Sequence, residues 1–197
     1  MATVSIVYFS GTGTTALLAE AIAKGARSLD GTQVNLLPIR GSEIVEGRWQ
    51  NDATLATLTA SDAIVFGTPT FMGGPAAQFK AFADATGGIW YNRGWRNKLA
   101  GGFTVSGSPS GDKLHVLTYL SALAAQHAMT WINPDLLPLT ASADPLGSNR
   151  LGSFLGVMGQ SAAAPGQPAA LHPGDAATGE TYGRRIASFA AGLRAAA

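Results

Sequence analysis

The beginning of the chain joins a short apolar segment to a loop of glycine and hydroxyl-bearing residues, and this loop to a helical pattern. The apolar segment, residues 4–9, is rich in β-branched and aromatic side chains, as expected of a strand buried on both faces. Residues 16–26 place their larger apolar side chains on one face of a helix. A second strand is expected at residues 33–39, so this part of the chain predicts a strand–helix–strand unit with parallel strands.

The alternation of strands and helices continues through most of the chain. Further strands are expected at residues 63–67, 99–106 and 129–133, and further helices at residues 52–59, 76–85, 113–126 and 181–195. This order predicts an α/β arrangement, in which a five-stranded parallel, doubly wound sheet carries helices on both faces. The length of 197 residues is enough for one domain with a full hydrophobic core.

Residues 141–179 interrupt this alternation. They are rich in glycine, alanine, proline and serine, and their apolar run at residues 154–158 is weak. We therefore expect a long loop excursion on the surface of a single domain that spans residues 1–197. An irregular segment of this length is rarely an idle connection.

The composition argues against several functions. A net charge of +1 with 13% charged residues produces no field that would attract nucleic acid or an anionic membrane. The absence of cysteine excludes disulfides, thiol nucleophiles and thiolate metal sites, and we expect no metal. No apolar run approaches the roughly 18 residues of a membrane span, and the N-terminus lacks a signal-peptide pattern. We expect a cytoplasmic protein whose uncharged surface is partly covered by partner subunits.

Three loops lie at the carboxyl ends of expected strands, where open α/β sheets bind ligands. They follow the strands at residues 4–9, 63–67 and 99–106 and consist mainly of glycine, proline, serine and threonine. The first loop opens a helix, so unpaired N–H groups and the positive end of the helix dipole face a ligand there. It contains four hydroxyls but neither lysine nor arginine, which predicts an anion site built from neutral donors.

Several interpretations of this first loop compete. A nucleoside triphosphate is disfavoured because the loop lacks the Gly-Lys-Ser/Thr ending of a Walker A motif. Gly11, Gly13 and Ala16 match the dinucleotide-binding fingerprint, and Arg40 after the second strand is suited to the 2′-phosphate of NADP. The density of hydroxyls instead favours a terminal phosphate monoester. A tight turn capped by serine or threonine, with no ligand, is the structural alternative.

Several segments together resemble known flavoproteins. Residues 10–15, SGTGTT, look like the phosphate loop of flavodoxins, Ser/Thr-x-Thr-Gly-x-Thr. Five further segments resemble the WrbA-type NAD(P)H:quinone oxidoreductases: residues 66–70 (FGTPT), 84–90 (DATGGIW), 98–100 (KLA), 106–108 (SGS) and 125–129 (AQHAM). Order and spacing agree from Val4 to about Met129, and the combination is specific although no single segment is.

The resemblance implies a flavodoxin-like fold, bound FMN, NAD(P)H as electron donor, a quinone as acceptor, and a homodimer or homotetramer. The residues that it places around FMN are Ser10, Gly11, Thr12, Gly13, Thr14 and Thr15 in the first loop, Pro69, Thr70, Phe71, Met72 and Gly73 in the second, and Ser106, Gly107, Ser108, Pro109, Ser110 and Gly111 in the third. It also implies that His127 reaches the flavin from a neighbouring subunit and that Trp90 lines the substrate pocket. We take these two as candidate catalytic residues.

The chain departs from the family pattern in two of these loops, and both candidate catalytic residues also have simpler structural explanations. Phe71 stands where the family has an arginine, which weakens the expectation of NAD(P)H more than that of FMN. Pro109 lies in a loop that is normally rich in glycine and threonine. His127 ends a helix, where the dipole alone favours a histidine, and Trp90 is equally suited to anchor a subunit interface.

These observations predict an FMN-dependent oxidoreductase that reduces quinones by two electrons with NAD(P)H. The alternatives are a flavodoxin-type electron carrier and an NADPH-dependent FMN reductase. A carrier generally has a strongly acidic docking face, whereas this chain has 12 acidic and 13 basic residues. The FMN reductases usually carry an arginine or more polar residues in the phosphate loop, and this loop has no arginine.

Overall fold

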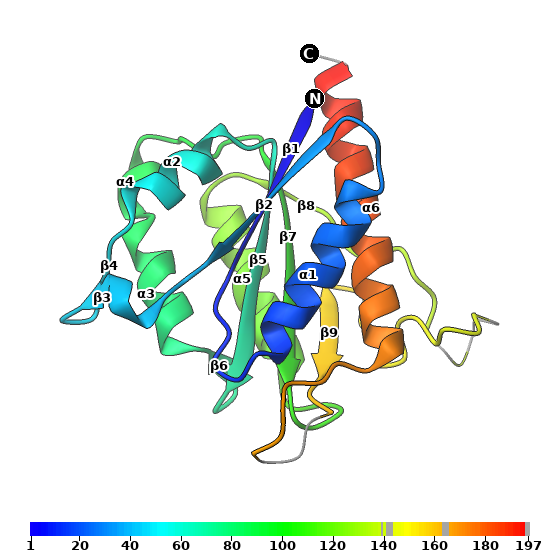
Figure 1. Ribbon diagram of the computed structural model, residues 1–197. Coiled ribbons are helices and arrows are strands. Elements are labelled where there is room, and N and C mark those ends of the chain that lie inside the picture. The colour runs from blue at the N-terminus through cyan, green and yellow to red at the C-terminus, as the bar shows by residue number, and fades with distance from the viewer. Residues whose placement is uncertain (139, 141–143, 163–165, 196–197) are drawn as a thin grey trace.

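The computed structural model describes residues 1–138, 140, 144–162 and 166–195. At its centre is a parallel sheet with five positions (Figure 1). In spatial order the strands are β2 (Thr32–Pro38), β1 (Ala2–Tyr8), β5 (Ala63–Phe71) and β7 (Leu99–Ser106), followed by β8 (Thr130–Trp131) together with β9 (Val157–Gln160). The chain order reverses between β1 and β5, which is the doubly wound topology that the sequence predicts.

Helices cover both faces of this sheet (Figure 1). One face carries α1 (Thr14–Arg27) and α6 (Pro173–Ala195), and the other carries α2 (Asp52–Ala60), α3 (Ala77–Ala85), α4 (Gly87–Tyr91) and α5 (Lys113–Gln126). Short elements complete the structure: η1 (Gly41–Glu43), the hairpin of β3 (Ile44–Val45) and β4 (Arg48–Trp49), and β6 (Gly74–Pro75), which pairs antiparallel with the end of β5. The predicted fold class is confirmed.

The two faces of the sheet have separate hydrophobic cores, because neighbouring residues of a strand point to opposite sides. Val4 and Ile6 of β1 pack in one core with Leu18 of α1. In the other core, Phe66 of β5 packs edge-to-face with Phe79 of α3, with 6.4 Å between the ring centroids. Burial on both faces explains why the strand segments are continuously apolar rather than alternating.

The fifth position of the sheet is shared by two short strands. β8 pairs with the first two residues of β7. β9 pairs with the last four, from Phe103 opposite Val157 to Ser106 opposite Gln160. The chain leaves the sheet after β8 and returns with β9, so the strand expected at residues 129–133 supplies only part of this position.

The prediction of a surface loop over residues 141–179 is wrong at two places. β9 lies within the sheet, and α6 begins at Pro173 rather than near residue 181. The sequence does not indicate the start of α6, because Gly174 in its first turn is a poor helix former in isolation. A β-carbon at Gly174 would lie 2.5 Å from the carbonyl oxygen of Gly147, so close packing requires glycine there.

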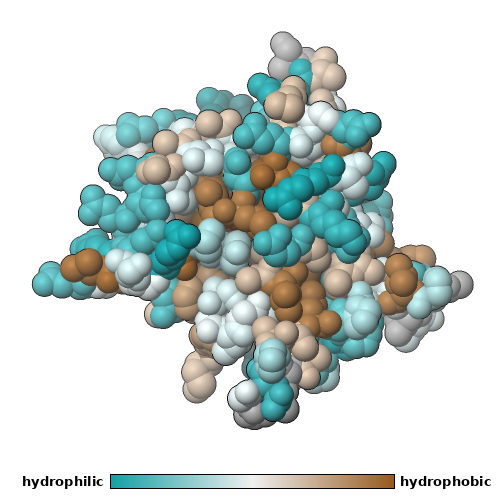
Figure 2. Space-filling model, viewed as in Figure 1, coloured by the Kyte–Doolittle hydropathy of each residue, from teal (hydrophilic) through white to brown (hydrophobic). Residues whose placement is uncertain are grey.

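The surface mixes apolar and hydrophilic residues. The edge strand β2 leaves Val34 and Leu36 only partly buried, and the space-filling view shows apolar patches between hydrophilic ones on this side (Figure 2). No helix within the described residues is long and apolar enough to cross a membrane. The same residues contain no cluster of three histidine or acidic side chains placed to hold a metal ion.

Helices α1 and α6 cross at two glycines. A β-carbon at Gly25 would lie 1.8 Å from the carbonyl oxygen of Glu180, and one at Gly183 would lie 1.9 Å from the carbonyl oxygen of Ile22. Backbone atoms on the other helix cannot yield to a side chain there, so the crossing is closed to larger residues. It fixes α6 against the helix that follows the first loop.

Replacement of Gly183 by alanine tests this crossing. The new methyl group would overlap the backbone at Ile22, so we expect the free energy of unfolding to fall by about 3 kcal/mol, the upper range for overpacking. Gly192→Ala in the same helix is the matched control, because Gly192 has open space around it and alanine should gain up to about 1 kcal/mol. Urea denaturation followed by circular dichroism measures both, and equal stabilities would contradict the close crossing.

Candidate functional site

Three loops meet at the edge of the sheet where β1, β5 and β7 end (Figure 1). The first loop is residues 10–15, the second is residues 69–75 and the third is residues 106–112. Because the three strands are neighbours and parallel, their carboxyl ends lie side by side. The structure thus brings together all the predicted cofactor-binding residues except His127.

The first loop presents unpaired donors at the start of α1. The hydroxyl of Ser10 is used inside the loop, where its Oγ accepts hydrogen bonds from the amides of Gly13 and Ala16 at 3.1 and 3.2 Å. Gly13 has a φ of +98°, a conformation that favours glycine. No acceptor among the described residues takes the amides of Thr14 and Thr15. These N–H groups are therefore available to an anion at the helix start.

The second loop is a tight hairpin that presents an aromatic ring. Its two central residues, Met72 and Gly73, have φ values of +48° and +76°, as in a type I′ turn. Phe71 precedes the turn and is 47% exposed. Its ring lies next to the first loop, since a β-carbon at Gly11 would be 3.4 Å from it. The exposed ring provides a flat apolar wall of the kind that ring-shaped ligands require.

Two hydrogen bonds attach the second loop to its neighbours. The hydroxyl oxygens of Thr70 and Thr104 lie 2.8 Å apart and are buried. Nδ1 of His115 on α5 lies 2.7 Å from the carbonyl oxygen of Gly73, so the ring donates its proton there. No sequence pattern indicated this role for His115, because it depends on α5 lying beside the hairpin.

The third loop encloses a buried lysine. Lys113, the first residue of α5, is fully buried, and its Nζ donates to Oγ of Ser106 at 2.8 Å and to the carbonyl oxygen of Ser108 at 2.6 Å. Burial lowers the pKa of the Lys113 ammonium, the nearby carboxylate of Asp175 raises it, and Arg150 lowers it. No sequence pattern distinguishes Lys113 from an ordinary first residue of a helix.

β9 and the residue after it connect the third loop to the first. The amide of Ser161 donates to the carbonyl oxygen of Ser106 at 3.0 Å, and its hydroxyl lies 3.2 Å from that of Thr14. Nε2 of Gln160 donates to the carbonyl oxygen of Gly107 at 3.1 Å. A segment expected as a surface loop therefore supports two of the three ligand loops, and its only sequence signal is the weak apolar run at residues 154–158, which overlaps the start of β9.

A buried ion pair holds Gln160 in place. Asp175 in the first turn of α6 is 1% exposed and accepts from Nε and Nη2 of Arg150 at 2.7 and 2.9 Å. Its Oδ2 also accepts from the amide of Gln160 at 2.8 Å. The helix dipole favours a carboxylate at this position. Through Gln160, α6 thus fixes the third loop.

His127 and Trp90 lie together at the edge of the sheet opposite the three loops. They line one small pocket with Tyr91, because α4 and the end of α5 meet there. Trp90 is half-exposed, whereas His127 is buried and packs against Trp95 with 4.5 Å between ring centroids. Within one protomer neither residue is near the candidate site.

The hydrogen bond with Thr86 determines which ring nitrogen of His127 carries the proton. The hydroxyl of Thr86 donates to the carbonyl oxygen of Ala83 at 2.7 Å, so it accepts from Nε2 of His127 at 2.9 Å. Burial lowers the pKa of the imidazole, so the ring is neutral at pH 7 and Nδ1 carries no proton. Nδ1 is buried and has no hydrogen-bond partner in the described part of the chain.

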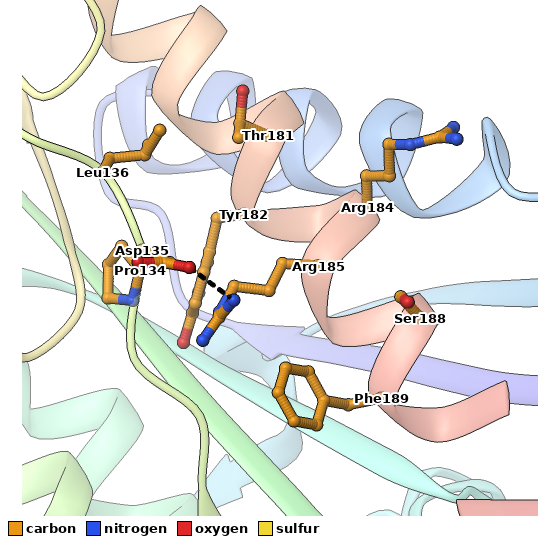
Figure 3. Close-up of a pocket in the computed structure, with 9 residues that line it drawn as sticks. All are labelled: Pro134, Asp135, Leu136, Thr181, Tyr182, Arg184, Arg185, Ser188 and Phe189. Atoms are coloured by element: carbon orange, nitrogen blue, oxygen red, sulfur yellow. Dashed lines mark hydrogen bonds and ion pairs between the residues drawn. The ribbon is translucent and has the colours of Figure 1, made fainter. Parts of the chain in front are cut away.

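A separate pocket of about 310 Å³ lies between the segment after β8 and the second half of α6 (Figure 3). Arg185 crosses it, with Nη1 at 3.0 Å from the carboxylate of Asp135 and its guanidinium 4.9 Å from the ring centroid of Phe189. The hydroxyl of Tyr182 donates to the carbonyl oxygen of Ile132 at 2.6 Å. Each of these polar side chains thus has a partner within the chain, and the pocket contains none of the predicted site residues.

A doubly wound sheet with an anion loop after β1, an aromatic hairpin after β5 and a third loop after β7 defines a flavodoxin-like protein. The family model of NADPH-dependent FMN reductases matches residues 4–138. The flavodoxin FldP of Pseudomonas aeruginosa is 38% identical over 192 residues, which are 96% of this chain and 97% of that protein. The NAD(P)H dehydrogenase (quinone) of Chromohalobacter salexigens is 36% identical over 141 residues, which are 66% of this chain and 69% of that protein. The crystal structure of the flavodoxin, WrbA-like protein from Agrobacterium tumefaciens has a TM-score of 0.72 at 38% identity, over 98% of this chain and 99% of that chain.

The chain therefore belongs to the NADPH-dependent FMN reductase family, as a WrbA-type member with a flavodoxin-like fold. It is an oxidoreductase flavoenzyme. The resemblance drawn from the sequence is confirmed, and it extends beyond Met129, because the relative from Pseudomonas aeruginosa aligns over nearly the whole chain.

Replacement of Asp175 by alanine tests the support of the third loop. It leaves the guanidinium of Arg150 without its carboxylate and the amide of Gln160 without its acceptor, and we expect a loss of about 3 kcal/mol of unfolding free energy, as for a broken buried pair. Glu180→Ala is the control, because it removes the exposed pair with Lys24 and should cost less than about 1 kcal/mol. Urea denaturation compares the two, and similar losses would show that the Asp175 pair stabilises no more than a surface pair.

Proposed function

We propose that the protein uses bound FMN to transfer electrons, two at a time, from NAD(P)H to a quinone. The observation that carries this proposal is the meeting of three different loops at one edge of the sheet. A terminal phosphate requires neutral donors at a helix start, and a flat ring system requires an apolar wall with a few polar groups. The first loop offers the donors, and the second and third loops offer the wall and the polar groups.

The residues present fit FMN. The amides of Thr14 and Thr15 and the exposed hydroxyl of Thr12 would hold the phosphate, whereas Ser10 shapes the loop from within. In the second loop, Pro69, Thr70, Phe71, Met72 and Gly73 would flank the ribityl chain and one side of the ring. The third loop, from Ser106 to Gly111, would close over the other side.

The dinucleotide alternative for the first loop has less support. Arg40, the residue suited to a 2′-phosphate, is engaged by Glu43: their side chains lie 3.7 Å apart, and the Arg40 amide donates to the Glu43 carboxylate at 3.1 Å. A carboxylate beside the guanidinium opposes the binding of a further anion there. This favours FMN over NADP as the ligand of the first loop.

Bound FMN supplies hydride transfer, in which the flavin ring takes up two electrons from a nicotinamide and passes them to an acceptor. The contribution of the protein is binding, orientation and exclusion of water. Phe71 offers an apolar surface on which a quinone can lie. Since Phe71 replaces the family's arginine, a nicotinamide nucleotide would bind there without a positive charge from this position.

A flavodoxin-type electron carrier is the second candidate. It is favoured by the name of the flavodoxin that is 38% identical over 96% of this chain. The balance of 12 acidic and 13 basic residues weighs against it, because carriers usually dock through a strongly acidic face. Both candidates require FMN, and they differ in whether NAD(P)H and a quinone are turned over.

Titration with FMN and a turnover assay test these alternatives. We expect one FMN per chain, detected by flavin absorbance and quenching of flavin fluorescence, and repeated oxidation of NADH or NADPH with benzoquinone as acceptor. Free FMN at the same concentration is the control. Failure to bind FMN would overturn both candidates, and binding without turnover of either nucleotide would favour the carrier.

The proposal includes a cytoplasmic homo-oligomer, a dimer or tetramer. His127 and Trp90 lie too far from the loops of their own protomer, so only another protomer can bring them to the flavin. Exposed apolar side chains at both edges support such contacts: Phe71 and Met72 beside the loops, and Tyr91 beside Trp90. Because Nε2 of His127 donates to Thr86, its ring must turn to donate to a flavin or a quinone.

Complementation between two variants with impaired activity tests this arrangement. His127→Ala should lower the turnover rate at least about tenfold if its proton serves the reaction. Gly13→Val should abolish FMN binding, because Gly13 has a positive φ and its β-carbon would lie 2.7 Å from Ala169. Co-expressed, the two variants should recover activity, since mixed oligomers contain sites with an intact loop and an intact histidine. Unchanged FMN affinity and rate in His127→Ala would exclude its role.

A further inference from the structure

We propose that Lys113 sets the reduction potential of bound FMN, by holding a positive charge behind the third loop that favours the reduced, anionic form of the ring. This inference rests on the FMN-binding part of the proposed function and not on the identity of donor or acceptor. It makes Lys113 a residue that tunes the cofactor.

The charge of Lys113 is not neutralised by a direct partner. Its two hydrogen bonds go to the uncharged oxygens of Ser106 and Ser108, and no carboxylate among the described residues lies within 4 Å of its Nζ. The nearby carboxylate of Asp175 is already engaged by both nitrogens of Arg150. Among the side chains of Lys113, Arg150 and Asp175, two cations face one carboxylate, so one positive charge is left over within this group.

The position of Lys113 in its helix adds to this potential. It is the first residue of α5, a helix of 14 residues, where the dipole is positive and a cation is normally disfavoured. Ammonium and helix dipole thus act in the same direction on the third loop. An anion at that loop would be stabilised by both, and it would in turn favour the charged form of the lysine.

The positive charge of Lys113 is not needed to hold the third loop in its conformation. The two acceptors, Oγ of Ser106 and the carbonyl oxygen of Ser108, would be satisfied by a neutral donor such as an amide. A buried ammonium is costly, because it loses its hydration. The structure therefore points to a function in which the charge itself matters.

Reduction of FMN places a charge where Lys113 can act on it. Uptake of two electrons and one proton converts the neutral ring into an anion, while the charge of the phosphate stays the same. A fixed cation beside the ring therefore stabilises the reduced form more than the oxidised form. Loss of this cation should weaken the binding of reduced FMN selectively.

Lys113→Met tests the inference, with Lys98→Met as matched control. Lys98 precedes β7, is partly buried and donates to the carbonyl oxygen of Ser61 at 2.7 Å. It lies at the other end of this eight-residue strand, roughly 25 Å away. The dissociation constants of oxidised and reduced FMN are measured for each variant, and the two-electron potential is determined against a reference dye.

We expect Lys113→Met to weaken the binding of reduced FMN about tenfold more than the binding of oxidised FMN. This difference lowers the two-electron potential by about 30 mV. Lys98→Met should leave this ratio unchanged. If the affinities for oxidised and reduced FMN fall equally, Lys113 only supports the loop and the inference is overturned. An unchanged potential would overturn it as well.

Lys113→Gln provides a second variant if the methionine variant does not fold. Its amide can donate to the loop without a charge, so the same selective loss is expected, whereas Lys113→Arg should retain the parent ratio. An FMN-binding parent that does not reduce quinones would overturn the proposed reaction and leave this inference standing. A parent that does not bind FMN would overturn both.

Discussion

β9 pairs with the carboxyl half of β7, and this pairing holds two of the three ligand loops in place. Without β9, the last residues of β7 would lack a neighbour on that side, because β8 pairs only with its first two residues. The ladder places Ser161 beside Ser106, and the hydroxyl of Ser161 also meets that of Thr14. One strand therefore sets the position of the third loop relative to the first. Asp175 connects this strand to α6, so the support continues into the helical layer.

The parts of the fold that could be predicted are those encoded by contiguous residues. The composition of residues 4–9 is enough to predict a buried strand. The glycines and hydroxyl groups of the loop that follows are enough to predict an anion-binding loop. β9 has only four residues, and its stability comes from pairing with a strand about 50 positions earlier, which no local pattern contains. The start of α6 was missed for a related reason: Gly174 and Gly179 disfavour a helix in isolation but permit close packing in the folded chain.

For the candidate site, residue types indicated the chemistry but not the direction of each side chain. Ser10 is predicted to hold the FMN phosphate, and its residue type does not reveal that its Oγ also accepts hydrogen bonds from two amides of its own loop. Lys113 looked like an ordinary first residue of a helix, yet its side chain turns back under the third loop. Asp112 before it has a φ of +54°, a backbone conformation that sequence alone does not reveal. The proton of His127 likewise depends on Thr86, which is 41 positions away.

The two ends of the site differ in how they treat charge, and this difference fits a cofactor that changes its charge at one end only. The phosphate of FMN has the same charge in both redox states, so neutral donors of the first loop that hold it as proposed would contribute equally to the affinity of each. Equal contributions cancel in the reduction potential, which depends on the ratio of the two affinities. If the ring of FMN lies at the third loop as proposed, a protein charge at this loop would act on one redox state and not on the other, because the ring changes its charge. A fixed cation is effective at that position only if water is excluded from it, and the complete burial of Lys113 meets this condition. In the proposed arrangement the first loop would determine how tightly the cofactor is held, and the third would determine how readily it accepts electrons.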